Sequence, residues 1–418
     1  MRILSRCSAA LLVSTFFTPA LAADINQAGA DDIARNLTKY VPKEIIDTGF
    51  LKVTPGSNRY ELVVDLQALI DHYKPQDFSI AGLKPFVHFL TPQENGLWRI
   101  EANQSLDATA SFGKGNEKMD VAYKIDSMMF DGMFDPSISY FSEARAMAPG
   151  FRFDSRSAAE TMSMTGGAME QVLTTRKLSD THVTLDSSGT IANYAQTVTS
   201  GATDKFVMKA GKVAADVRFE NFGIGPFSEL VVFILDKANS RTDKLTPEEG
   251  EKLRAILKAN LPFGDLLKEK ITFSNLAVEA QGMRATVEEI GYAFDFNGVR
   301  RDSRFGIDFT ASKPVIPPGM LPPGTEEALP ETIGVGFAVT NLNLADAASY
   351  FLDHADLSAD EPLTPTESAE IQKIILPDGK IHIEFRNIYA RSNHYDIEVS
   401  GTMIGDAGDS NRFSADMT

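Results

Sequence analysis

The side chains best suited to acid–base or metal chemistry in this sequence are its six histidines and its many carboxylates. No two histidines stand at the H-x-H or i, i+4 spacing that directs two imidazoles at one metal ion. His354 in "LDHAD" is the strongest candidate because Asp353 and Asp356 flank it. Its counterpart in a related upstream segment is Lys237, so we expect His354 to be a solvated helix residue and His382 to face solvent.

Motifs for nucleophilic or phosphate chemistry are also missing. There is no G-x-S-x-G nucleophile elbow and no P-loop, and Ser111 to Lys114 matches S-x-x-K without the helix that would aim the lysine. "GDAGDSN" at Gly405 lacks the distal bidentate glutamate of a calcium loop, and we expect a polar tail there. The sequence therefore predicts no catalytic residue, no metal ligand and no cofactor.

The first 22 residues, "MRILSRCSAALLVSTFFTPALA", have the three parts of a secretory signal peptide. Arg2 and Arg6 precede an apolar stretch, Ala9 to Phe17, and Ala20-Leu21-Ala22 forms a small-x-small cleavage site. A retained membrane anchor is the alternative, but the stretch is short for a bilayer, which takes about 20 residues. We expect cleavage after Ala22, a periplasmic or secreted protein, and no transmembrane segment in the mature chain.

Cleavage would remove Cys7, the only cysteine. The mature chain would then have neither a disulfide nor a thiol nucleophile. The formal net charge is −17 at pH 7, which repels the phosphate backbone of nucleic acids. The charge of the chain therefore argues against nucleic-acid binding.

One helix start occurs twice, as "LTPEEGEKLRAIL" at Leu245 and "LTPTESAEIQKII" at Leu363. In each copy a threonine N-cap, a proline and a glutamate three residues after the cap form a capping box. "VFILDKAN" and "SYFLDHAD" lie upstream of the two copies, and "ITFSNLAVEA" and "IEFRNIYARS" lie downstream. The pattern predicts an internal duplication of a strand–helix–helix–strand unit, over about Lys212–Asp308 and Glu331–Gly408.

These patterns predict an α+β protein, predominantly antiparallel β-sheet. Residues 23–205 are expected to form a β-rich domain with one or two helices, followed by repeat unit 1 (206–311), a Pro-rich connector (312–330) and repeat unit 2 with a C-terminal tail (331–418). The connector is either a semi-rigid spacer or a surface loop. In the first domain we expect helices at Ala28–Tyr40 and Ser137–Met147, and a hairpin around Pro92 to Gly96.

Phe-x-Asn recurs at Phe219/Asn221, Phe273/Asn275 and Phe385/Asn387, with Val339/Asn341 as a variant. Asparagine tolerates left-handed backbone geometry, which predicts a turn or bulge at each position. Asn297-Gly298 is a separate hairpin signal.

A cluster of aromatic and methionine side chains is the candidate site for an apolar ligand, because such side chains line adaptable grooves. The alternative is that they form core. The candidates are Trp98, Phe89, Met129, Phe130, Met133 and Phe134.

At "LTPQENGLWRIEAN", "LDHADLSADEPLTPTESAEI" and "LPDGKIHIEFRNI" the chain resembles a family of uncharacterised exported bacterial proteins with a domain of unknown function. That resemblance implies localisation and a β-rich architecture, but no activity. A fainter similarity to AsmA-like envelope proteins, on the repeated strands that end in Asn-apolar pairs, implies envelope or lipid handling.

We therefore expect an exported, non-enzymatic periplasmic protein that binds a lipid-like or apolar ligand or a partner protein of the cell envelope. The alternative is a periplasmic hydrolase without a recognisable motif. Two convergent acids or a Ser/His pair in a cleft would favour the hydrolase, whereas a continuous apolar groove would favour binding.

Overall fold

The computed structural model describes residues 25–418 except 39–40, 42, 74–76, 202–203, 241–243, 318, 323–324 and 326–327. The expected signal peptide lies outside the described residues. The chain divides into two compact units: unit 1 reaches Asp180 and includes Gly189–Val207, and unit 2 comprises Thr181–Ser188 and Met208–Thr418. Both expected repeats fall in unit 2. We describe each unit by itself.

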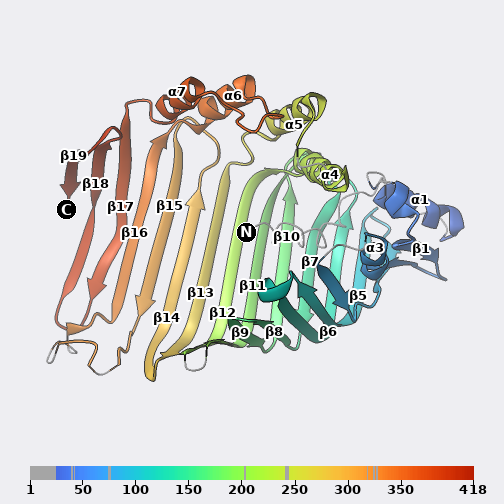
Figure 1. Ribbon diagram of the computed structural model, residues 1–418, viewed down its shortest axis with the longest axis horizontal. Coiled ribbons are helices and arrows are strands. Elements are labelled where there is room, and N and C mark those ends of the chain that lie inside the picture. Colours follow the sequence, from blue (N-terminus) through green and yellow to red (C-terminus); the bar gives the residue numbers. More distant parts are fainter. Residues whose placement is uncertain are drawn as a thin grey trace. The chain divides into compact units, whose positions relative to one another are not determined.

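Unit 1 is built on an antiparallel sheet in which β5 and β6 each pair with two neighbours on one edge (Figure 1). One series of pairings runs β1–β2–β4–β5–β6–β7–β10, and a second runs β3–β5–β6–β8–β9–β11. The strands are β1 (Leu51–Pro55), β2 (Tyr60–Val64), β3 (Phe78–Ala81), β4 (Phe86–Pro92), β5 (Trp98–Phe112), β6 (Met119–Asp135), β7 (Tyr140–Ala148), β8 (Phe151–Ser157), β9 (Glu160–Gly166), β10 (Met169–Lys177) and β11 (His182–Ser200).

The core of unit 1 lies between this sheet and helix α1 (Gln27–Leu37), with α2 (Lys43–Ile46) and α3 (Leu66–Tyr73) nearby in sequence. Helix α1 begins at Asn26, whose side chain accepts a hydrogen bond from the Gly29 amide. Ala30 and Ile33 lie on the inward side of α1 and contact the buried residues of β1, β2, β4 and β5. The expected N-terminal helix and the hairpin between β4 and β5 are confirmed.

The helix expected at Ser137–Met147 is wrong, because that segment is a turn followed by β7. Strand β7 pairs with β6 on one side and with β10 on the other. Its sequence, "YFSEARAMA", contains good helix formers, but local propensity is a weak preference that pairing along both edges overrides.

Unit 2 is an antiparallel meander in which each strand from β14 onward pairs with the strand before it. Two helix pairs interrupt it. The helices α4 and α5 lie between β12 and β13, and the helices α6 and α7 lie between β16 and β17. The elements are β12 (Asp204–Gly223), α4 (Ile224–Ser240), α5 (Pro247–Asn260), β13 (Leu266–Ala280), β14 (Met283–Phe296), β15 (Ser303–Ser312), β16 (Thr332–Leu342), α6 (Leu344–His354), α7 (Pro365–Ile375), β17 (Lys380–Arg391), β18 (Asp396–Asp406) and β19 (Asp409–Met417).

Predominantly antiparallel sheet is thus confirmed. Strand β19 replaces the polar tail expected after Gly405. The turn between β14 and β15 contains Asn297-Gly298, with Gly298 at φ +89°, as its hairpin signal predicted. Among the described residues, none of the helices combines the length and the apolar character needed to cross a membrane.

Both predicted capping boxes are present. At α5 the Thr246 amide donates to Glu249 Oε2 at 2.6 Å, and the Glu249 amide donates to Thr246 Oγ1 at 3.2 Å. At α7 the same bonds join Thr364 and Glu367 at 2.8 and 3.3 Å. Each box satisfies amide donors that the first helical turn otherwise leaves unpaired.

The four asparagines of the Phe-x-Asn pattern all have left-handed backbone geometry, and the turn or bulge predicted at each of them is confirmed as a bulge at two. Their φ angles are +53° at Asn221, +53° at Asn275, +59° at Asn341 and +50° at Asn387. The strand register shifts beside Asn341 and at Asn387, so at these two positions the asparagine marks a β-bulge.

The Pro-rich connector joins two strands that pair directly, β15 and β16. Val315 of the connector and Thr286 of β14 exchange backbone hydrogen bonds of 2.7 and 3.0 Å. These contacts favour the surface-loop interpretation of the connector over that of a spacer between domains.

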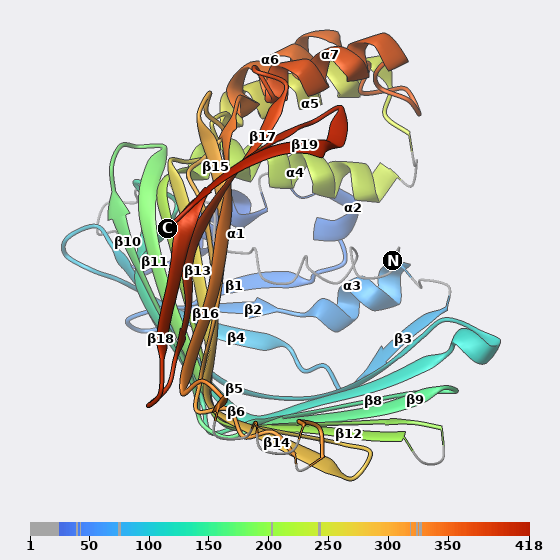
Figure 2. The ribbon, with the colours of Figure 1, turned by 90° about the vertical axis from the view of Figure 1, so that its left-hand side faces the viewer.

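The two helix pairs of unit 2 are joined by side chains of α5. Arg254 donates to the carbonyl of Ala355 at 2.6 Å and to that of Leu352, at the end of α6. Lys258 forms an ion pair with Asp353 at 2.6 Å. Helices α4–α7 therefore form one array at one end of the unit 2 strands, and they extend to one side of that sheet (Figure 2).

Candidate apolar binding surface

The two faces of the unit 2 sheet differ sharply in chemistry. Successive side chains of a strand point to opposite faces, and residues paired across strands share a face. In β15, Phe305, Ile307 and Phe309 point to one face, whereas Arg304 and Asp308 point to the other. We call the first the apolar face and the second the polar face.

On the apolar face, cross-strand pairs form rows that run across the strands. Row A crosses all of β13 to β19 and contains only apolar side chains: Leu267, Phe296, Phe305, Val339, Ile383, Met403 and Ala415. Row B runs parallel to row A and lies two residues away from it on every strand. It consists of Glu269, Phe294, Ile307, Phe337, Phe385, Gly401 and Met417. Glu269 is the single charged member of the two rows.

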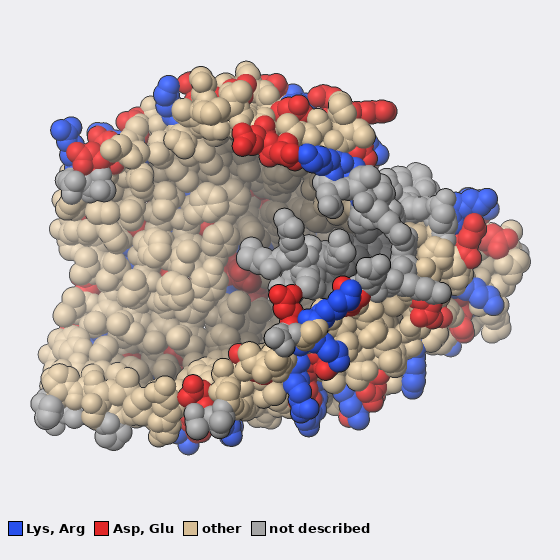
Figure 3. Space-filling view, viewed as in Figure 1, with Lys and Arg blue, Asp and Glu red and all other residues tan. Residues whose placement is uncertain are grey.

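Large side chains of the apolar face are exposed. Their exposed fractions range from 37% at Phe337 to 66% at Phe413. The exposed members are Phe309, Val335, Phe337, Ile381, Ile397, Phe413 and Met417. Figure 3 shows this side of unit 2, on the left, as a hollowed surface beneath the helices with very few charged side chains. Helix α4 adds Phe227 and Ile234, exposed by 37% and 57% and spaced seven residues apart on one side of the helix.

Burial is inverted between the two faces, as β16 illustrates. Its small residues Gly334, Gly336 and Ala338, which point to the polar face, are buried, whereas Val335 and Phe337 on the apolar face are exposed. At β16 the polar side is therefore covered and the apolar side is open, which is the reverse of a half-buried strand in a globular core.

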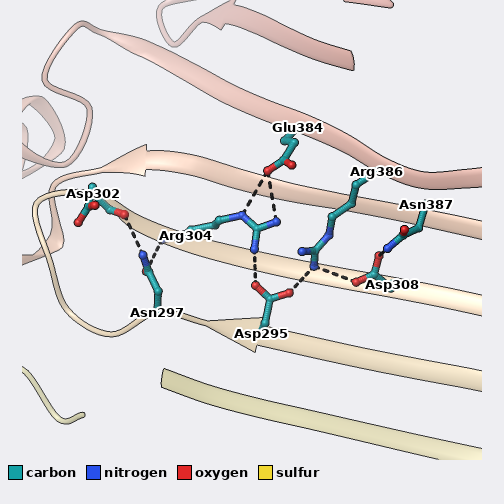
Figure 4. Close-up of polar contacts among 8 residues, drawn as sticks. All are labelled: Asp295, Asn297, Asp302, Arg304, Asp308, Glu384, Arg386 and Asn387. Atoms are coloured by element: carbon teal, nitrogen blue, oxygen red, sulfur yellow. Dashed lines mark hydrogen bonds and ion pairs between the residues drawn. The ribbon is translucent and has the colours of Figure 1, made fainter. Parts of the chain in front are cut away.

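A network of ion pairs covers the polar face (Figure 4). Arg386 on β17 contacts Asp308 on β15 at 2.8 Å and also Asp295 on β14. Arg304 contacts Asp295 at 2.5 Å and Glu384 at 3.2 Å. The side chains of Arg386, Asp295 and Asp308 are each exposed by 20% or less.

Glycines make this network possible. A Cβ atom added at Gly306 would clash with the Arg386 guanidinium, and one added at Gly336 would clash with the Asp308 carboxylate. The long arginine side chain therefore lies flat over β16 and reaches two strands away. The two aspartates that come together here are compensated by arginine, which fits a structural network better than an acid–base pair.

The six sequence-predicted contact residues lie on different faces of unit 1. Trp98 and Phe134 pair across β5 and β6 and are 4% and 0% exposed, within the core beneath α1. Phe130 packs against the same core. For Trp98 and Phe134 the structure supports the core interpretation, because such buried side chains offer a ligand no surface.

Phe89, Met129 and Met133 border a depression of about 750 Å³ on the outer face of unit 1, and Phe130 also contributes to its lining. Charged side chains line this depression together with the apolar ones. Arg59 lies over the Phe89 ring at 3.7 Å, and Arg99 forms an ion pair with Asp131 at 2.8 Å. The hydrogen bond from Arg99 lowers the pKa of the Asp131 carboxyl. A ligand role for Phe89, Met129 and Met133 stays a prediction.

The histidines do not assemble a site in the described part of the chain. His354 ends α6, with Nδ1 at 2.8 Å from the Tyr350 carbonyl and its ring stacked on Tyr350. His382 points to the polar face and contacts Asp378 at 2.6 Å, which lowers the pKa of Asp378. His88 is largely buried, and burial lowers its pKa. Among the described residues, no group of three or more His, Cys, Asp or Glu side chains could hold a metal ion.

The residues of the apolar face were not predicted as a site. The sequence signal was present, since Ile381, Ile383 and Phe385 alternate with polar residues, but that pattern is the same for a covered and an uncovered sheet face. Comparison of the chain with protein-family models, with curated proteins and with solved structures finds no match.

Proposed function

We propose that this protein is a non-enzymatic binding protein that holds the hydrocarbon part of a lipid-like ligand against the apolar face of unit 2. The observation that supports this proposal is row A, an uninterrupted apolar row across β13 to β19, next to side chains that are exposed by up to 66%. Exposed apolar surface of this extent is typical of an interaction site.

The geometry of the rows favours a flexible chain over a compact ligand. Neighbouring strands are spaced about 4.8 Å apart, so six intervals make a row roughly 29 Å long. That length is about that of the hydrocarbon core of a bilayer, roughly 30 Å, and so about twice the depth of one leaflet. Rows A and B are two residues apart along each strand, so a flexible chain lying across the strands would contact both.

Burial of methylene groups would supply the affinity. A fully buried methylene contributes about 0.8 kcal/mol. An open protein surface covers roughly one side of a bound hydrocarbon chain. Each methylene of the ligand is therefore expected to contribute about 0.4 kcal/mol of binding free energy. Affinity should therefore rise about fourfold for every two carbons added to a fatty acid, until the chain outgrows the rows.

We further infer that unit 2 arose by internal duplication, which would double the length of the apolar face. In its support, β12–α4–α5–β13–β14 and β16–α6–α7–β17–β18 have the same element order. Corresponding positions carry the capping boxes at Thr246 and Thr364, and the left-handed asparagines Asn275 and Asn387. In the first copy Lys237 contacts the capping Glu249 at 2.8 Å. In the second copy the hydrogen bonds from Thr364 are the main cause of the lowered pKa of Glu367, and the counterpart His354 adds a smaller lowering.

Export and envelope localisation are part of the same proposal and rest on residues 1–22 alone. The proposed site does not depend on them, because it is formed entirely by described residues of unit 2. Detection of the intact or the cleaved N-terminus by mass spectrometry of the cellular fractions tests this part separately.

The experiment that tests the binding function is native mass spectrometry of the purified protein, followed by organic extraction and lipid analysis. A stoichiometric adduct that disappears on extraction and is recovered as a defined lipid is the expected result. Titration of the extracted protein with fatty acids of 12, 14 and 16 carbons should then show the stepwise gain in affinity. A protein that is free of adduct and binds none of these acids would refute the proposal and favour a protein partner or a hydrolase.

A further inference from the structure

Strand β19 is paired along one edge, with β18, and its other edge forms the end of the unit 2 sheet (Figure 1). Ser400 and Thr418 exchange backbone hydrogen bonds of 3.0 and 2.8 Å. In an antiparallel ladder such pairs alternate with pairs whose N–H and C=O groups point away. The outward-pointing backbone groups of β19 therefore belong to Phe413, Ala415 and Met417.

This edge has little of the protection that usually prevents sheet edges from pairing. Such edges are blunted by prolines, bulges, short strands or inward charges. The described part of β19 contains no proline. The register between β18 and β19 shifts only near the start of β19, next to Asp406 of β18, so Phe413 to Met417 are regular. Phe413 and Met417 are also exposed by 66% and 45% on the apolar face.

We propose that β19 pairs antiparallel with β19 of a second copy of this chain, about a twofold axis that passes Ser414. A twofold axis perpendicular to a sheet keeps equivalent faces on the same side. The apolar faces of the two copies would therefore continue into each other across the new pair of strands. This inference goes beyond the proposed function and does not depend on what the apolar face binds.

Charge and size complementarity select this register. With Ser414 on the axis, Arg412 of each copy stands opposite Asp416 of the other on the polar face. On the apolar face Phe413 stands opposite Ala415, a large side chain against a small one. Phe413 and Ala415 would form a hydrogen-bonded pair, so the two symmetric pairs would supply two backbone hydrogen bonds each.

Neighbouring registers are less complementary. Placing Phe413 on the axis sets this bulky residue against itself and leaves Arg412 opposite a serine. Arg412 is available for the new pair, because its present contact with Asp409 is long, at 3.3 Å, and its side chain is 78% exposed.

The test uses single-cysteine variants of the full chain in a Cys7→Ser background. Ser414→Cys should form a disulfide-linked dimer under mild oxidation, since cross-strand Cα atoms at the axis would lie about 4.5 Å apart, within disulfide range. Thr402→Cys is the matched control. Thr402 is on β18, one strand further from the axis than Ser414. It pairs with Asp416, so it lies on the same polar face, and it should not crosslink. Equal crosslinking of both variants would overturn the proposal.

A charge swap tests the register without cysteine. Sedimentation equilibrium should show a dimer whose dissociation constant rises about tenfold in Arg412→Asp or Asp416→Arg, because each places like charges opposite each other twice. The double variant Arg412→Asp/Asp416→Arg should restore dimerisation. A monomer at all concentrations would overturn the pairing, and a dimer that neither responds to the swap nor crosslinks through Ser414→Cys would overturn the register.

Discussion

Arg386 on β17 and Asp308 on β15 are joined at 2.8 Å across the intervening strand, because Gly336 on β16 places no side chain between them. This contact, with that from Arg386 to Asp295, links β17 to β15 and β14 on the polar face. It adds cross-strand side-chain contact on the face opposite the exposed apolar side chains.

Arg386→Met is expected to lower the free energy of unfolding by about 1–3 kcal/mol, because two largely buried carboxylates lose a charged partner. The loss is moderated because Asp295 keeps Arg304 and Asp308 keeps Asn387. Urea denaturation measures the change. Arg391→Met is the control on the same strand: its partners Asp396 and Glu398 are exposed, and its midpoint should hardly move. Equal effects of the two changes would contradict a stabilising network.

Phe309→Gln is expected to weaken binding of a 16-carbon fatty acid about tenfold, because it removes one exposed ring from the apolar face. The neighbouring Thr310→Gln introduces the same side chain on the polar face of the same strand and should leave affinity unchanged. Isothermal titration of both variants distinguishes the faces. Equal weakening by both would place the ligand elsewhere.

Phe134→Ala is expected to cost about 3–5 kcal/mol of unfolding free energy, because the Phe134 side chain is fully buried. Met129→Ala, five residues away and on the opposite face of β6, should change it by no more than about 0.5 kcal/mol, because Met129 is 43% exposed. Near-ultraviolet circular dichroism during urea unfolding follows unit 1 through Trp98. Similar costs would show that the two faces of β6 are equally packed.

The capping glutamates should make stability depend on pH. The hydrogen bond from Lys237 lowers the pKa of Glu249, and that from the Thr364 amide lowers the pKa of Glu367, both from 4.5. A depressed folded-state pKa means that this stability is fully present above pH 4.5 and is lost as pH falls through the folded-state pKa values. The melting temperature of the wild type should therefore exceed that of Glu249→Gln/Glu367→Gln at pH 7. The gap should close at acidic pH, and a constant gap would contradict this assignment.

Much of the fold could be predicted because its signals are local. The two caps, the Asn297-Gly298 turn and the left-handed asparagines each depend on a few adjacent residues, and the structure has them where the sequence indicated. The helix expected at Ser137–Met147 failed because pairing with β6 and β10, which is not local, decided the conformation.

The candidate site could not be predicted in the same way. Met129 to Phe134 look like one cluster in the sequence, but alternation along β6 sends Met129 and Met133 to one face and Phe130 and Phe134 to the other. In unit 2 the alternation does identify an apolar face. Whether another layer covers that face depends on the whole chain, and here helices α4–α7 gather at one end of the strands.

The order of strand pairing in unit 2 also has a kinetic consequence. From β14 to β19 each strand pairs with its predecessor, so the sheet can grow by adding one strand at a time. Every intermediate then has a free edge beside a partly formed apolar surface, a combination that favours aggregation. The growing sheet would be most prone to aggregation while β17 to β19 are still unpaired.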